Sequence, residues 1–117
     1  MAASGMFYEA WSDVVTALTD GGFAVVRDPR NARPMTVFVN PPTGAMVAHD
    51  VADITITLKI LAAPPGNLDA AEYLVTQLDG IADLDTIAIT TFEPTVTEVG
   101  DQSVPSYDVA VRLSERR

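Results

Sequence analysis

The chain contains no cysteine and a single histidine among its 117 residues. Without cysteine it can form no disulfide, no thiolate metal site and no cysteine nucleophile. The one histidine, His49, lies close to Asp50 and Asp53, but a transition metal there would have only one nitrogen ligand beside carboxylate oxygens. A small metal site or half of a catalytic triad is therefore the weaker interpretation. We expect His49 to be an ordinary loop or strand-edge residue, and we predict no metal site.

Signature motifs of nucleotide binding and serine hydrolysis are also missing. The sequence contains no Gly-x-Ser-x-Gly, no Gly-x-x-x-x-Gly-Lys and no Gly-x-Gly-x-x-Gly. The carboxylate pair Asp83 and Asp85 follows Gly80, a composition that favours a solvated turn over acid–base catalysis. Trp11 lies within an apolar stripe, which favours core packing over ligand stacking. We therefore predict that the protein is not an enzyme, has no catalytic residues and needs no cofactor.

Basic side chains are few: seven Lys and Arg stand against sixteen Asp and Glu, a net charge of −9. Such a charge repels nucleic acid and anionic lipid, so we expect no tight DNA binding and no membrane partner. The sequence shows neither a signal peptide nor a run of about 18 apolar residues, which predicts a soluble protein made in the cytosol. A chain of this length predicts one domain, residues 1–117.

Apolar residues recur at helical spacing in two places. The first is residues 6–18, which Gly21 and Gly22 follow as residues that suit a helix C-terminus. Its apolar stripe consists of Phe7, Ala10, Trp11, Val14, Val15 and Leu18. The second helix is predicted to begin at Leu68 after an Asn67 cap, with a stripe of Ala71, Leu74, Val75, Leu78 and Ile81.

Alternating apolar and β-branched residues predict five strands, at 23–27, 35–40, 52–61, 86–94 and 106–113. The third strand has one apolar and one polar face, which indicates an antiparallel sheet. We expect a hairpin between the first two strands, joined by residues 28–34, and an acidic loop at residues 95–105. The order α-β-β-β-α-β-β predicts a two-layer α+β domain, in which two helices pack on one face of a mostly antiparallel sheet of about five strands.

Three of the seven basic residues, Arg27, Arg30 and Arg33, fall in one Pro-, Asp- and Asn-rich segment. A solvated hairpin loop is one interpretation. The other is a cationic prong that binds the acidic surface of a second copy of the chain, with Glu98 and Asp101 in residues 97–102 as candidate receivers. Contacts between a positive patch and a different negative patch run head to tail and can close into rings.

Four stretches together resemble the tail terminator, or tail completion, proteins of long-tailed bacteriophages, and the resemblance spans nearly the whole chain. They are "FYEAWSDVVTALTDGG", "VFVNPPTG", "DITITLKILAAPPGNLDAAEYLVTQLDGI" and "SYDVAVRL". The resemblance implies a structural virion protein of the tail or neck, assembled in the host bacterial cytoplasm. Its subunits would form a hexameric ring that caps the tail tube, stops its polymerisation and joins it to the head-side connector.

The same resemblance implies the partners: other copies of the chain, the tail tube protein and the connector protein, with DNA passing through the ring without specific binding. It also implies that hairpin loops contact neighbouring subunits and rings, here residues 28–34 and 95–105. Alternative functions are another head-tail neck or adaptor protein, a small acidic inhibitor or binding module, and a small enzyme. The carboxylates are scattered rather than ranked along one face, which disfavours a nucleic-acid mimic.

Overall fold

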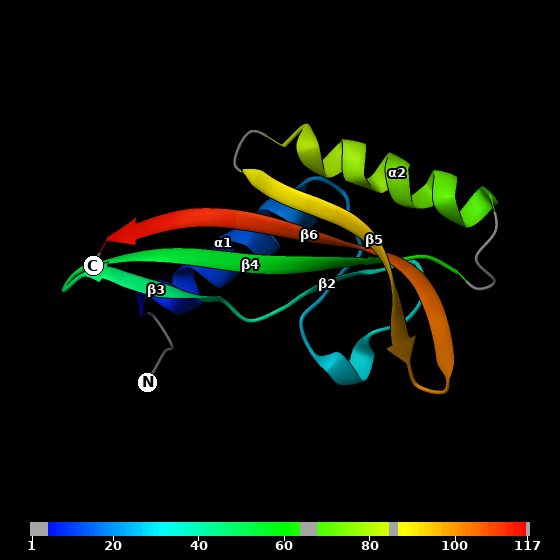
Figure 1. The fold of residues 1–117 in the computed structure, drawn as a ribbon, viewed down its shortest axis with the longest axis horizontal. Helices are drawn as coiled ribbons and strands as arrows, with labels where there is room; N and C mark the ends of the chain where they lie inside the picture. The colour runs from blue at the N-terminus through cyan, green and yellow to red at the C-terminus, as the bar shows by residue number, and fades with distance from the viewer. Residues whose placement is uncertain (1–4, 64–67, 85–86, 117) are drawn as a thin grey trace.

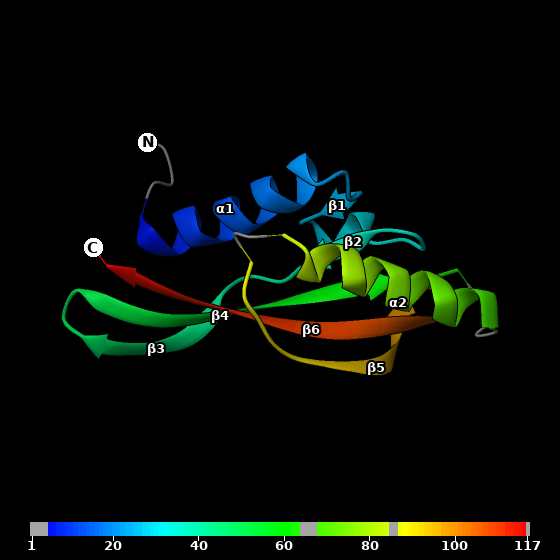
Figure 2. The same ribbon diagram turned by 90° about the horizontal axis from the view of Figure 1, so that it is seen from above.

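The computed structural model describes residues 5–63, 68–84 and 87–116. In this part of the chain two α-helices lie on one face of a single six-stranded sheet (Figures 1 and 2). The elements are α1 (Met6–Asp20), β1 (Val25–Val26), the 3₁₀ turn η1 (Pro29–Asn31), β2 (Val37–Val39), β3 (Thr43–Ala48), β4 (Val51–Leu61), α2 (Leu68–Ala82), β5 (Ile89–Val99) and β6 (Gln102–Arg116). The α+β class is confirmed, with six strands in place of about five.

Both helices lie where the periodicity predicts them. The chain leaves α1 at Gly21, whose N–H donates to the Ala17 carbonyl, and Gly22 then adopts a φ of +91°, which glycine tolerates best. The core contacts differ in detail from the predicted stripes. Met6 is buried while Phe7 is 45% exposed, and in α2 the buried position is Ala70 rather than its exposed neighbour Ala71. The predicted Asn67 cap lies outside the described residues.

β4 is the central strand of the sheet. One edge of it pairs with β6 along its whole length, from Val51↔Arg116 to Leu61↔Ser106. Its other edge is shared, because β2 pairs with residues 58–60 and β3 with residues 51–55. The sheet order is therefore β1-β2-β4-β6-β5, with β3 attached to the free half of β4.

The core lies between the helices and the face of the sheet that they cover, called here the inner face. Alternate residues of β4 and β6 enter it with the buried faces of both helices: Ala52, Ile54, Ile56, Leu58, Ile60, Val109 and Val111, with Ala10, Val14, Leu18, Ala70, Leu74 and Ile81. Fully burying one large aliphatic side chain stabilises a fold by about 1.5–3 kcal/mol. The alternation predicted for residues 52–61 is confirmed.

The opposite, outer face of the sheet carries polar residues. The Lys59 ammonium lies 2.8 Å from the carboxylate of Asp108, its cross-strand neighbour, and Arg112 lies 3.1 Å from Asp53. All four side chains keep solvent access, and exposed pairs contribute only about 0–1 kcal/mol. This face therefore adds little to stability, as expected for the wet side of an antiparallel sheet.

The predicted hairpin between the first two strands is wrong, because β1 and β2 run parallel. The chain between them forms η1 and then turns at Pro34 and Met35, where Met35 takes a φ of +69°. These bends bring Val37 into β2 in the same direction as β1, and its N–H donates to the Ala24 carbonyl.

The predicted loop at residues 95–105 is also wrong. Except for the turn at Gly100 and Asp101, these residues belong to β5 and β6, which pair from Ile89↔Val111 to Val99↔Gln102. Gly100 has a φ of +60°, as a tight hairpin turn requires. β4 ends opposite Ser106, so residues 96–105 continue past it as a two-stranded ribbon, called here the arm. In Figure 1 the arm bends to the side of the sheet on which η1 lies.

The root of the arm is firmly packed. Leu61, Val104 and Ser106 are buried although they follow the register of the outer face, and Thr36 and Val26 are buried too. The backbone closes this end of the sheet, because Met35 and Thr36 exchange hydrogen bonds of 2.9 Å with Leu61. Figure 1 shows α2 above the strands at this end and η1 below them, so the sheet is covered on both sides here.

Candidate assembly surfaces

The arginine segment, residues 27–33, is built around η1. Asp28 precedes this turn, and its carboxylate accepts from the Arg30 backbone N–H at 2.9 Å and from the Arg30 guanidinium at 2.8 Å. The Arg30 side chain nevertheless remains 89% exposed. Arg30 is thus paired within its own loop but still faces solvent.

This pair changes the protonation of Asp28. The side-chain hydrogen bonds from Arg30 hold the pKa of the Asp28 carboxyl below its usual value, and the backbone N–H of Arg30 adds to the effect. The same contact raises the pKa of Arg30. Asp28 therefore stays ionised and partly neutralises the arginine that the sequence suggested was available to a partner.

Arg27 lies over the indole ring of Trp11, with the guanidinium carbon 5.2 Å from the ring centroid. Trp11 is held in turn by its indole N–H, which donates to the Val39 carbonyl at 3.4 Å, and by an edge-to-face contact with Tyr8 at 6.3 Å. A cation over an aromatic face gains about 0.5–1 kcal/mol at an exposed site. The half-buried Trp11 thus packs against the core, as predicted, and also positions Arg27.

Arg33 is the least engaged of the three arginines. Its guanidinium donates to the Asn31 carbonyl at 3.3 Å, and it forms no ion pair among the described residues. The structure therefore orders the arginines by availability: Arg33 first, Arg30 second, because Asp28 must release it, and Arg27 last.

The candidate acidic receivers both lie on the arm. Glu98 belongs to β5 and accepts a short hydrogen bond from the Ser103 hydroxyl of β6, while Asp101 is exposed in the turn. In Figure 1 the tip of the arm and η1 lie on the same side of the sheet. η1, which contains Arg30, and the tip of the arm, which contains Glu98 and Asp101, thus lie on one side of the molecule, called here the η1–arm side.

The other sequence candidates lie apart from this side. His49 is exposed in the β3–β4 turn, and Asp53 pairs with Arg112. Throughout residues 5–63, 68–84 and 87–116, no three His, Cys, Asp or Glu side chains are grouped as a metal site would need. Asp83 is exposed just after α2, and Asp85 lies outside the described residues. None of the helices in the described ranges is long and apolar enough to cross a membrane.

A strand that the sequence analysis missed forms a further candidate surface. All six residues of β3 are exposed and none is charged. β3 pairs only with β4, so within the described chain its second edge carries no strand. The sequence signal for this strand is the short run Ala45–Ala48. Because Pro41, Pro42 and Gly44 precede this run, the sequence favours a turn there.

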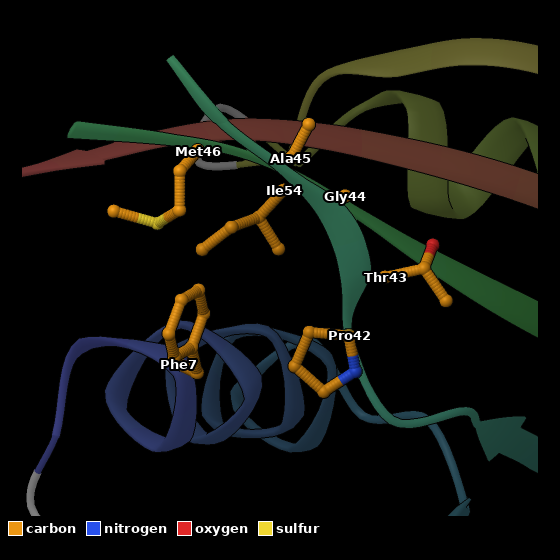
Figure 3. Close-up of a pocket in the computed structure, with 7 residues that line it drawn as sticks. All are labelled: Phe7, Pro42, Thr43, Gly44, Ala45, Met46 and Ile54. Carbon is orange, nitrogen blue, oxygen red and sulfur yellow. The ribbon is translucent and has the colours of Figure 1, made fainter. Parts of the chain in front are cut away.

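A small apolar hollow of about 140 Å³ lies between this strand and the N-terminal part of α1 (Figure 3). Phe7 points up into it from α1 and Ile54 points down from β4, while Met46 flanks it and Pro42 closes the far side. Gly44 lines the hollow from β3. A Cβ there would lie 2.0 Å from the Asp53 carbonyl oxygen, so only glycine fits this position.

A second hollow, about 300 Å³ in volume, separates α2 from the β5–β6 hairpin and is mainly apolar; it is lined by Ala70, Ala71, Leu74, Val75, Pro94, Thr95, Pro105, Ser106 and Tyr107. Ala71 and Val75, which the sequence places on the apolar stripe of this helix, line the hollow and are exposed.

A scan of the chain against protein-family models gives no match, and a search of curated proteins gives none either.

Proposed function

We propose that the protein is a ring-forming tail terminator of a long-tailed bacteriophage, a structural subunit that caps the tail tube, stops its polymerisation and joins it to the head-side connector. The observation that carries this proposal is the arm. It extends the sheet past the end of β4 as a two-stranded ribbon whose tip, with Glu98 and Asp101, is exposed.

A ribbon of two strands is marginally stable alone, so an exposed arm with a packed root suits a lever that docks on a neighbour. Hairpins used between subunits are also what the resemblance implies for residues 95–105. The buried root of the arm, at Val104, fixes the direction of the arm, and the exposed tip supplies contact residues.

Charge supports contact between copies of the chain. The body is strongly acidic, with a net charge of −9, and Arg33 is an exposed cation without a carboxylate partner among the described residues. A neighbouring acidic surface would complement it, and desolvated charge pairs at interfaces are sensitive to loss of one partner, at about 2–5 kcal/mol. The negative charge also suits a bore through which DNA passes without adhering.

The test is assembly on purified tail tubes, followed by electron microscopy of the tube ends and by the length of tubes polymerised with the protein present. We expect a ring at one end and shorter tubes. Arg33→Glu should weaken capping, most of all at low salt, where screening is least. The matched control is the double variant Thr16→Glu and Thr76→Glu, which changes the net charge equally at exposed helix positions. Bare tube ends with the parent protein would exclude the terminator function, and binding only to the isolated connector would favour the neck adaptor instead.

A further inference from the structure

The edge of β3 that faces away from β4 is unpaired within residues 5–63, 68–84 and 87–116 and carries no charged residue, which is unusual for a sheet edge. Natural proteins protect exposed edges with charged residues, proline, bulges or very short strands, because an open edge pairs with other chains. β3 has a bulge at Val47, between the register pairs of Met46 and Ala48, but Thr43–Met46 pair regularly with Thr55–Ala52. Met46 is 47% exposed and Val47 63%.

We propose that this edge pairs antiparallel with β3 of a second copy, around a two-fold axis at Ala45. In that register Ala45 lies opposite its own equivalent, and Met46 of each copy lies opposite Gly44 of the other. Residues directly opposite in an antiparallel pair point to the same face. Gly44 and Met46 both share the inner face, because their partners in β4 are the core residues Ile54 and Ala52.

In this register the Met46 side chain of each copy therefore lies beside a residue of the other copy, Gly44, that has no side chain. Gly44 is itself part of the lining of the hollow of about 140 Å³, together with Phe7, Pro42 and Ile54. A cavity of about 150 Å³ lined by apolar side chains holds a benzene molecule, so this hollow is large enough for one methionine side chain. Methionine is unbranched and adapts to irregular gaps. Figure 3 shows Phe7 pointing toward the strand from α1, where the incoming side chain would meet it.

A second copy is the occupant that the charges favour. Two chains of net charge −9 repel each other, so they meet best where neither carries charge, and β3 has none. The nearest carboxylate in the same row is Asp53, beside Ala45, and it is paired with Arg112. The two Asp53 residues would be three strand spacings apart, roughly 14 Å. That exceeds the screening length of about 8 Å at physiological salt.

The other long edge of the sheet is a poor alternative partner. β5 carries Glu93, Pro94 and Glu98, and a register irregularity between Ile89 and Thr91. Proline donates no hydrogen bond and the glutamates keep the strand solvated, which are the protections that β3 lacks. This asymmetry favours pairing of β3 with β3.

The proposal does not depend on the proposed function, because a two-fold contact pairs two copies whether or not a ring also forms.

The test is disulfide cross-linking, which is selective because the parent chain contains no cysteine. Cα atoms directly opposite in an antiparallel pair lie about 4.5–5.5 Å apart, within the range of about 4.4–6.8 Å that a disulfide spans. Ala45→Cys should therefore form a disulfide-linked dimer when oxidised glutathione accepts the two electrons and two protons of the thiols.

Thr43→Cys is the matched control on the same exposed strand. Its two copies would be offset by four residues, roughly 13 Å along the strand, too far for a disulfide. Equal cross-linking of both variants, or none for Ala45→Cys, would overturn the proposal.

A second test needs no cysteine. Met46→Lys places a charge at the contact and should raise the dimer dissociation constant at least about tenfold by sedimentation, because a buried unpaired charge is costly. Val75→Lys is the control, since Val75 is 45% exposed and lies on α2. In the parent protein the backbone amides of Thr43–Val47 should exchange more slowly as concentration rises. Exchange that is independent of concentration, in a protein that sediments as a monomer throughout, would contradict the pairing.

Discussion

Two exposed regions of this molecule differ in how their polar groups are satisfied. The arginine segment and the arm carry charged side chains, yet Arg30 is paired with Asp28, Arg27 lies over Trp11, and Glu98 accepts from Ser103. β3 carries no charge, but in the described chain no strand pairs with its second edge. The unpaired N–H and C=O groups of a strand edge favour association with another chain more strongly than exposed charges that are already paired.

The first prediction replaces one glycine in each region by alanine, and here we expect the largest effect on the free energy of unfolding. Gly44→Ala should destabilise the fold by about 3 kcal/mol, because a φ of +153° is strained for other residues and the new Cβ would meet the Asp53 carbonyl at 2.0 Å. Gly100→Ala, in the turn of the arm, should cost only about 1–2 kcal/mol, because its φ is +60° and no atom of the described residues lies within 4 Å of the new Cβ. Urea unfolding measures both. Equal costs would mean that β3 is not held closely against β4.

The second prediction concerns the arm, whose root is packed and whose outer part is exposed. Val104→Ala should destabilise the fold by about 2 kcal/mol, since Val104 is fully buried and the change leaves a cavity. Val96→Ala should change stability by less than about 0.5 kcal/mol, because Val96 is 65% exposed. Thermal and urea unfolding distinguish them. A neutral Val104→Ala would show that the arm is free along its length.

The third prediction concerns two residues that protect the edge of β5 against pairing with another chain, Glu93 and Pro94. Replacing Glu93 and Pro94 together by threonine should leave the free energy of unfolding within about 1 kcal/mol, because both side chains are exposed. It should also make the protein associate at lower concentration, since β5 would then present an unprotected edge like that of β3. Sedimentation velocity over a concentration series measures this. Unchanged association would show that these two residues do not guard the edge.

The smallest effect is expected at Asp28. Its pKa is lowered in the folded protein by hydrogen bonds from Arg30, so its contribution to stability is present above the unfolded pKa and is lost as pH falls through the folded pKa. Arg30→Ala should return the Asp28 pKa toward its ordinary value and flatten this acid-side dependence. Carboxyl NMR titration measures the shift. A pKa unaffected by Arg30→Ala would show that the pair is not formed in solution, and Arg30 would then be as available as Arg33.

Much of the fold was predictable from the sequence, because it rests on strong periodicity. The run from Ile54 to Ile60 alternates so regularly that only a half-buried strand satisfies it, and Gly21 with Gly22 marks the end of α1. β3 was missed because its apolar run is short and follows two prolines and Gly44, so pairing with β4, rather than local preference, makes it a strand.

The candidate site was predictable only in part. The sequence places three arginines in one exposed segment, but it cannot show that Asp28 and Trp11 already engage two of them. The arm was read as a loop because its charged and polar residues obscured the Gly100–Asp101 hairpin turn. Partnership between residues distant in sequence, such as Arg27 and Trp11, depends on the tertiary fold and leaves no local pattern.

The proposed function requires that this protein assembles with its own copies at the end of a tail tube. The most direct measurement is cryo-electron microscopy of tail tubes incubated with the protein, with averaging of the tube ends. The account predicts a ring of six copies at one end of each tube, present for the parent and for the Thr16→Glu, Thr76→Glu double variant, and depleted for Arg33→Glu. Bare tube ends, together with a protein that remains monomeric at every concentration and salt tested, would contradict it.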